Sequence, residues 1–374
     1  MTPDLRRLVR YFLRLGATGF GGPIVLVEHM RRDLVDEHGW ISAEEYRDGL
    51  ALSQLAPGPL AAQLAIYLGW VRGGTRGATL VGLAFVAPSL VMVLALSALY
   101  VRLGGIPWMV SAFYGVGAAV IAIIARSAFV LARRTLGRDR LLWGIFAVNG
   151  VVTAWTASEL LWVLLASGVA VMVVRGHHPR IPLRTVAPAL ALPVGLLGVG
   201  STLHAQLFFF FAKASLVVFG SGLAVVPFLY GGVVETHHWL DDRQFLDSVA
   251  VSMLTPGPVV ITVAFIGYLV AGPGGAAVAA LGMFLPVYLA VVLAAPYYHR
   301  IRERAYIRAF VEGVTAAAAG ALAGATVVLA QRAIVDLPAV LIALVAFALL
   351  DRRLKVPEPA LILAAGVAGV LLKA

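Results

Sequence analysis

Two matching stretches decide the fold that we expect: residues 52–60 read LSQLAPGPL, and residues 251–259 read VSMLTPGPV. Each stretch places a Pro-Gly-Pro triplet near the middle of a hydrophobic segment. Proline cannot donate a backbone hydrogen bond, and glycine adds conformational freedom. We therefore expect a helix to break at each triplet and to restart with Pro59 or Pro258 in its first turn.

The two triplets belong to a duplication that covers nearly the whole chain. At an offset of 199, residues 14–59 align with residues 213–258 without a gap, and thirteen of the 46 positions are identical. After one deletion the offset becomes 198 and the alignment continues. One structural unit should therefore occur twice. The matched pairs include Phe20 with Phe219, Gly21 with Gly220, Trp40 with Trp239, Asp48 with Asp247, Pro88 with Pro286, Gly115 with Gly313 and Arg134 with Arg332.

The composition predicts an integral membrane protein. Of the 374 residues, 61% are hydrophobic and 13% are charged, and the mean hydropathy is +0.92. Soluble domains are roughly half apolar and about a quarter charged. Apolar segments recur along the whole length, six in each copy. In the first copy they lie at 8–27, 48–71, 78–100, 107–131, 141–156 and 159–174, and in the second at 207–228, 247–271, 276–297, 307–330, 337–350 and 357–372.

The number of segments predicts that the two copies have opposite orientations. One further apolar stretch, residues 186–200, lies between them, and six segments plus one give an odd number of crossings. Most arginines then fall in loops expected on the inside, as the positive-inside rule requires. We expect an all-α integral membrane protein with two inverted-topology repeats, 1–180 and 206–374, joined by a linking helix at 181–205. Broken helices at the repeat interface are typical of secondary transporters.

Several other classes of protein are not indicated. The net charge of +10 comes from arginines in short turns, which points to membrane topology and not to nucleic-acid binding. Without cysteine the chain has no disulfide or Cys metal site. His177–His178 and His237–His238 lack the spacing of metal ligands, and there is no Walker-type phosphate loop. We expect no enzyme activity, no bound metal and no cofactor.

The helix breaks are the first candidate binding site. A half-helix that restarts in the membrane centre points free N–H groups and partial positive charge at that depth, which suits an anion. The alternative is a plain kink. A second pair of breaks is expected at the glycine-rich stretches 19–23 and 219–222, where close helix packing is the alternative. The candidate residues from both pairs are Phe20, Gly21, Gly22, Pro57, Gly58, Pro59, Phe219, Gly220, Gly222, Pro256, Gly257 and Pro258.

Charged and polar neighbours complete the candidate site. Arg14 and Lys213 occupy the same repeat position and would suit a dianion, although both could instead extend to the membrane surface. Gln54, Gln63, Thr255 and Thr262 flank the breaks and could hydrogen-bond an oxyanion, or satisfy broken-helix backbone groups instead. Arg126 and Glu312 also lie in apolar segments, and for these two we favour solvation over proton relay.

A structural role is expected for the segments that begin at the two matched tryptophans. Ser42 and Asp241 each precede a Glu or Gln by three residues, namely Glu45 and Gln244. This spacing predicts a capping box at the start of a helix, with the tryptophan anchored at the membrane interface.

Taken together, these motifs resemble the chromate ion transporter family. The resemblance rests on Phe20-Gly21-Gly22-Pro23, Trp40 and Pro57-Gly58-Pro59 in the first copy. In the second copy it rests on Phe219-Gly220-Ser221-Gly222, Trp239, Thr255-Pro256-Gly257-Pro258 and Gly267-Tyr268. The family resemblance implies two homologous domains of opposite orientation. It also implies efflux of chromate across the bacterial inner membrane, driven by the membrane potential or a proton gradient, with sulfate as a competitor.

Three positions depart from the family pattern and leave the anion open. Ser221 stands where glycine is common, Met253 replaces a glutamine, and Ala56 precedes the first break. The expected function is export of chromate or a related tetrahedral oxyanion by a multi-pass protein of a bacterial or archaeal plasma membrane. The alternatives are a sulfate or oxyanion channel, an uptake permease with the same lining, and a scaffold without transport. The expected partners are the anion and the lipid bilayer, and a homodimer is left open.

Overall fold

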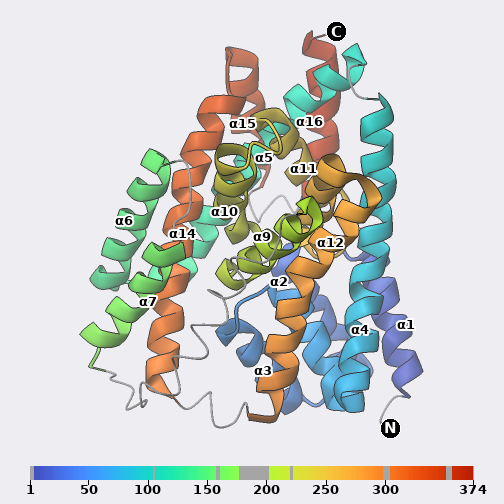
Figure 1. Ribbon diagram of the computed structural model, residues 1–374, viewed down its shortest axis with the longest axis vertical. Coiled ribbons are helices and arrows are strands. Elements are labelled where there is room, and N and C mark those ends of the chain that lie inside the picture. The colour runs from blue at the N-terminus through green and yellow to red at the C-terminus, as the bar shows by residue number, and fades with distance from the viewer. Residues whose placement is uncertain are drawn as a thin grey trace.

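The computed structural model of the protein describes residues 4–103, 106–156, 161–176, 202–219, 222–297, 304–350 and 356–373. These residues form helices with short connections, and no β-strand occurs among them (Figure 1). The all-helical class expected from the sequence is therefore confirmed. The linking helix expected at 181–205 lies almost entirely outside the described residues.

The helices follow the order of the duplication. In the first copy they are α1 (Leu5–Thr18), α2 (Gly22–Arg31), the π-helical η1 (Arg32–Glu37), α3 (Ala43–Leu55), α4 (Leu60–Leu103), α5 (Pro107–Leu136), α6 (Arg140–Thr156) and α7 (Leu161–Val174). In the second they are α9 (Leu203–Val217), η3 (Gly222–Val225), α10 (Val226–Tyr230), η4 (Gly231–Thr236), α11 (Asp242–Leu254), η5 (Val259–Ile261), α12 (Thr262–Ala294), η6 (Ala295–Tyr297), α14 (Ala305–Ala333), α15 (Leu337–Leu349) and α16 (Glu358–Lys373).

The first apolar segment of each copy is a helical hairpin and not a single span. Gly19 is extended and Gly21 has φ +113°, so α1 ends there and the chain reverses into α2. The Tyr11 hydroxyl donates to Asp33 Oδ2 at 3.0 Å, which holds the two arms side by side. In the second copy Phe210 of α9 stacks on Phe228 of α10, with ring centroids 5.3 Å apart. The segment expected at 8–27 is therefore two antiparallel helices.

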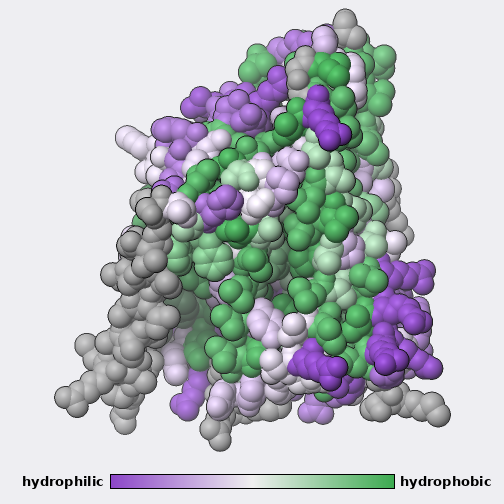
Figure 2. Space-filling model, turned by 45° about the vertical axis from the view of Figure 1, so that its right-hand side comes forward, coloured by the Kyte–Doolittle hydropathy of each residue, from purple (hydrophilic) through white to green (hydrophobic). Residues whose placement is uncertain are grey.

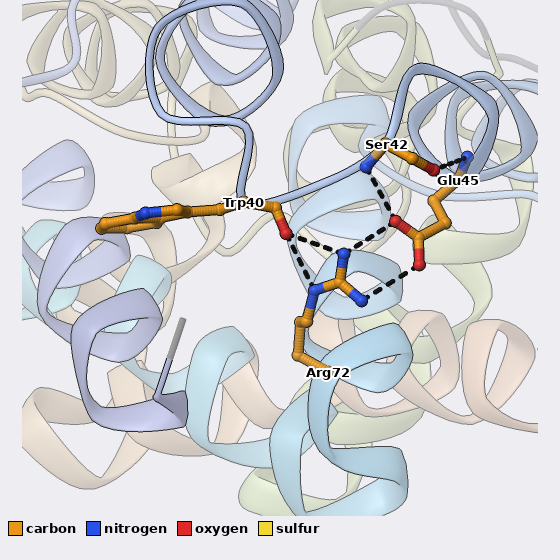
Figure 3. A network of polar contacts seen from close by, with 4 residues as sticks. All are labelled: Trp40, Ser42, Glu45 and Arg72. Atoms are coloured by element: carbon orange, nitrogen blue, oxygen red, sulfur yellow. Dashed lines mark hydrogen bonds and ion pairs between the residues drawn. The ribbon is translucent and has the colours of Figure 1, made fainter. Parts of the chain in front are cut away.

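The second apolar segment is also a hairpin, and an ion pair holds its outer end. The capping box predicted from Ser42 and Glu45 is confirmed at the start of α3. Glu45 also accepts two hydrogen bonds from the Arg72 guanidinium, at 3.0 and 2.7 Å, and Arg72 donates to the Trp40 carbonyl oxygen (Figure 3). Because Arg72 lies in α4, these bonds bring the start of α3 against α4. The matching capping box of Asp241 is confirmed in the second copy.

α4 and α12 each contain a sharp reversal near their first third. Gly74 has φ +56° and Gly272 has φ +62°, values at which glycine is strongly favoured. A Cβ added at Gly69 would overlap the carbonyl oxygen of Gly77, so the two arms of this turn pack backbone to backbone. The part of each helix that follows the reversal is the long one. Among the described residues, four helices are long and apolar enough to cross a membrane, namely Leu60–Leu103, Pro107–Leu136, Val259–Tyr297 and Ala305–Ala333.

The C-terminal helices of each copy pack on the other copy. α6 and α7 lie against α14, while α15 and α16 lie against α5 (Figure 1). Arg175 ion-pairs with both Asp139 of its own copy and Glu312 of α14, and its hydrogen bond holds the pKa of Asp139 below the ordinary value. A matching contact joins Lys373 and Tyr114 to the carboxylate of Asp336. The two copies are therefore interlocked.

The outer surface is suited to lipid. Large apolar side chains are exposed along the long helices, including Leu83 at 62%, Val91 at 64% and Leu293 at 67%. Figure 2 shows a face that is hydrophobic through its middle, with most hydrophilic residues toward its upper and lower ends. In Figure 1, α1, α2 and α3 lie in the lower half of the molecule and α10 and α11 in the upper half.

The Arg72–Glu45 contact gives a first prediction. Glu45→Ala removes both the capping acceptor and the ion pair, so we expect it to lower the free energy of unfolding by about 1–3 kcal/mol. Glu45→Gln keeps the cap, as Gln244 does in the second copy, and should cost less. Thermal unfolding of the purified protein in detergent measures both. Glu44→Gln, which changes an exposed neighbour, is the control. Equal melting temperatures for Glu45→Ala and this control would contradict the assignment.

Candidate functional site

Both Pro-Gly-Pro triplets interrupt helices, as the sequence predicts. α3 and α11 end just before their triplets, and α4 and η5 begin just after them. At the centres of the breaks, Gly58 has φ +137° and Gly257 has φ +97°. The restart differs in one detail, because Pro258 is the N-cap of η5 and the Pro59 carbonyl accepts the first bond of α4 from the N–H of Gln63. The prolines thus precede the first turn instead of lying in it.

The breaks of the two copies are hydrogen-bonded to each other. The Gly58 N–H donates to the Val218 carbonyl oxygen at 2.8 Å, and the Gly257 N–H donates to the Gly19 carbonyl oxygen at 2.8 Å. The two donors are one repeat apart in sequence, and so are the two acceptors. Each Pro-Gly-Pro break therefore meets the glycine-rich break of the other copy, and all four breaks lie together at the centre of the molecule.

Side chains close to the breaks mostly satisfy their backbone groups. The Gln63 amide nitrogen donates to the carbonyl oxygens of Ala56 and Pro57, at 3.1 and 2.8 Å. Its Oε1 is buried and has no hydrogen-bond partner in the described part of the chain. In the second copy the Thr262 hydroxyl lies within hydrogen-bond distance of the Val259 carbonyl oxygen, at 2.9 Å, and of Ser252 Oγ, at 2.6 Å. The contacts of Gln63 and Thr262 therefore fit the alternative role expected for them, which is to satisfy backbone groups at the helix breaks.

A cavity of about 480 Å³ opens beside the breaks. Its walls come from the start of α2, from α5, from η3, from the residue that follows the second Pro-Gly-Pro break, and from the end of α15 and the start of α16. The cavity therefore joins both copies. Its lining includes Phe20, Gly21, Gly22, Pro23, Arg126, Arg134, Leu223, Val259 and Glu358.

Two sources of positive charge face this cavity. Arg126 lies about two-thirds of the way along the 30-residue helix α5, is half-buried, and makes no ion pair among the described residues. Its guanidinium carbon lies 5.7 Å from the centroid of the Phe129 ring. The second source is the N-terminus of α2, where Gly21 is the N-cap and no side chain caps the helix. The first-turn N–H groups of α2 are thus left without intrahelical partners.

The two cations predicted for the site lie elsewhere. Arg14 is exposed on α1 and does not line the cavity. Lys213 is half-buried beside His237, and burial together with the Lys213 charge lowers the pKa of that histidine. Positive charge at the cavity comes instead from α5.

The other predicted residues divide into three groups. Phe20, Gly21 and Gly22 line the cavity together, whereas Gln54 is exposed and Gly220 lies outside the described residues. The remaining residues surround the breaks without lining the cavity. They are Pro57, which is half-buried, and the buried Gly58, Pro59, Gln63, Phe219, Gly222, Thr255, Pro256, Gly257, Pro258 and Thr262.

Two arginines that line the cavity, Arg126 and Arg134, were not among the candidate residues predicted from the sequence. The signal for Arg126 was present, because a cation far inside an apolar helix is expensive and is by default functional. Its repeat-equivalent position holds Gly324, so comparison of the copies does not select it. Arg134 follows two turns later on the same helix, on the same cavity.

Comparison with known proteins identifies relatives over the full length. The chromate transporter family model matches residues 6–172 and 205–370. A chromate transport protein of Cupriavidus metallidurans is 56% identical over 375 residues, covering 99% of this chain and 94% of the relative. A probable chromate transport protein of Synechococcus elongatus is 51% identical over 376 residues, covering 98% and 95%. A chromate transport protein of Pseudomonas aeruginosa is 33% identical over 385 residues, covering 98% and 92%. No solved structure matches the chain.

The central break gives a second prediction. A Cβ added at Gly257 would overlap Ser89 Oγ, and φ there is +97°. We expect Gly257→Ala to lower both the melting temperature and the anion flux, because the break must shift to make room. Gly74→Ala is the matched control, since φ is also positive there but the added Cβ meets open space. Thermal unfolding and flux in proteoliposomes are the measurements. The packing argument fails if the two variants lose equal stability.

Proposed function

The chain belongs to the chromate transporter family, and we propose that it moves chromate or a related tetrahedral oxyanion across the membrane as a secondary active transporter. Both copies of the repeat fall within the matched residues, so the similarity to the family covers both copies. We place this activity in the plasma membrane of a bacterium or archaeon. The proposed direction is export, driven by the membrane potential or a proton gradient.

One observation carries the proposal: Arg126 and the uncapped N-terminus of α2 face the same cavity. A tetrahedral dianion needs compensating positive charge and several hydrogen-bond donors when it leaves water. The guanidinium supplies charge and a planar set of donors. The backbone of Gly21 and Gly22 carries no side chain, so an anion can approach the N–H groups of α2 closely.

The remaining cavity residues have distinct proposed roles. Val259 brings the start of η5 to the cavity wall, so the second Pro-Gly-Pro break contributes its helix N-terminus from the other copy. Arg134 is exposed two turns from Arg126 and would attract anions to the cavity. Glu358, on the opposite copy, would repel an anion that is not held by both arginines.

An inverted arrangement of the two copies, which we propose here, would support alternating access. The paired bonds at Gly58 and Gly257 have the reciprocal form expected of a pseudo-two-fold axis, as does the packing of α6–α7 and α15–α16 on the opposite copies. We propose that this axis lies in the membrane plane and that the arginine-rich loops face the cytoplasm. Rocking of one copy against the other would then expose the cavity alternately to each side.

The role of Arg126 gives a third prediction. Arg126→Gln removes the charge that compensates the anion, so we expect chromate flux to fall by about tenfold to a hundredfold, the equivalent of a lost charge-assisted hydrogen bond. Arg126→Lys should keep part of the flux. Uptake of radiolabelled chromate by proteoliposomes is the measurement. Arg47→Gln removes one exposed cation from α3 and is the control. Equal flux in Arg126→Gln and the control would refute the site.

A fourth prediction separates the transporter from the alternatives. A channel or a passive permease can only dissipate a gradient, whereas a coupled transporter accumulates its substrate. We expect vesicles under an imposed pH gradient, with the membrane potential clamped at zero, to accumulate chromate above the external concentration. Sulfate should compete more strongly than a monovalent anion such as nitrate, because two charges are compensated at the cavity. Strictly downhill flux would favour the channel.

A further inference from the structure

A second cavity lies at the other end of α5, away from the proposed anion site. The anion cavity includes residues 126–134 of that helix, whereas the second cavity, of about 280 Å³, includes residues 110–117. Its other walls come from the first turns of α11 and the end of α14. Asp247 of α11 is part of its lining.

Asp247 is a deeply buried carboxylate. Only 2% of the residue is exposed, and no cation forms an ion pair with it among the described residues. Its Oδ2 accepts a hydrogen bond of 2.7 Å from the hydroxyl of Tyr100, near the end of α4. A carboxylate held by one neutral donor in an apolar environment is costly while it is charged. Because Asp247 adjoins a cavity, water can bring it a proton.

The surroundings of Asp247 contain both signs of charge. Arg332 of α14 contacts Asp242 at 3.5 Å, so these two largely compensate each other. The titratable and charged groups around Asp247 are Tyr100 of α4, Tyr114 of α5, Arg332 of α14, and Asp241, Asp242 and Arg243 at the start of α11.

Building on the proposed transport function, we propose that Asp247 is the proton-binding site through which a proton gradient drives the anion. The step is a simple protonation, in which one proton joins the carboxylate and the neutral acid later releases it. No other reactant takes part. The charge at this position changes from negative to neutral and back once in each cycle.

The position of Asp247 connects its change of charge to the anion site. Asp247 belongs to the second copy and Tyr100 to the first, so their hydrogen bond links the two copies. α11 runs from Asp247 directly into the second Pro-Gly-Pro break, where the Gly257 N–H donates to Gly19 and Val259 lines the anion cavity. Protonation weakens the bond to Tyr100, because a charged acceptor is the stronger one. The first turns of α11 are then free to move relative to α4. The Pro-Gly-Pro break at the other end of α11 moves with the helix.

The sidedness follows from the proposed orientation. The end of α4 and the start of α5 lie at the end of the molecule opposite the N-terminus, which we place in the cytoplasm (Figure 1). The cavity of Asp247 includes Val110 in the first turn of α5 and would open to the outside. A proton from outside would therefore bind at one end of the molecule while the anion enters at the other.

The test uses proteoliposomes of the full chain, with the membrane potential clamped by potassium and valinomycin. Radiolabelled chromate uptake is measured under pH gradients of both polarities, together with a pH dye inside the vesicles. We expect the wild type to accumulate chromate under one polarity. Asp247→Asn should reduce this accumulation and the linked proton movement by at least about tenfold, since an amide cannot be protonated at these pH values. Downhill chromate exchange should remain within about twofold. Glu44→Gln is the control.

A second variant covers a failure of Asp247→Asn to fold. Tyr100→Phe removes the donor that favours the charged carboxylate, so the pH of half-maximal accumulation should move to higher pH by about one unit. Undiminished pH-driven accumulation in Asp247→Asn, or an unchanged pH midpoint in Tyr100→Phe, would overturn the inference alone. A wild-type protein that moves no chromate in any gradient would overturn the proposed function as well.

Discussion

The interior of a membrane offers no water to backbone groups, and this constraint governs how the four helix breaks are arranged. A break at that depth is stable only where its N–H and C=O groups find partners in the protein. Gly58 and Gly257 find them at Val218 and Gly19, in the other copy. Because the N–H groups of these two glycines are satisfied only by the opposite copy, the two copies must assemble around each other. The cavity beside the breaks is a product of that assembly.

Much of this frame could be predicted from the sequence. Residue spacing indicates local chemistry, and three features follow from it. They are the duplication, the helix breaks at 57–59 and 256–258, and the capping boxes at Ser42 and Asp241. The hairpins were harder to predict. A continuous apolar run has the same hydropathy whether the chain crosses the membrane or turns back within it. Hydropathy therefore does not indicate the reversal between α1 and α2. Only glycine marks it.

The candidate site illustrates a different limit. Comparison of the copies favours positions that are alike, and it selected Arg14 and Lys213 because both are cations. The cavity and the breaks beside it also contain positions that differ between the copies. Arg126 has Gly324 as its counterpart, and Ser89, whose hydroxyl donates to the Pro256 carbonyl oxygen at 2.7 Å, has Val287. Two copies with the same fold can line an asymmetric ligand pathway when their side chains differ. Which of these differences matter is clear only when the structure shows which residues lie together.

The interlocked C-terminal helices have a consequence for biosynthesis. Gly115 of α5 packs against the backbone of Ala365 in α16, so its partner is made roughly 250 residues later. At roughly 5–20 residues per second, α5 waits on the order of ten seconds or more in the membrane before α16 emerges from the ribosome. During that interval its small-residue face is open to lipid, to the insertion machinery or to proteases. Helix α16 thus completes the packing of the first copy, and a nascent chain that stops before α16 leaves both copies incomplete.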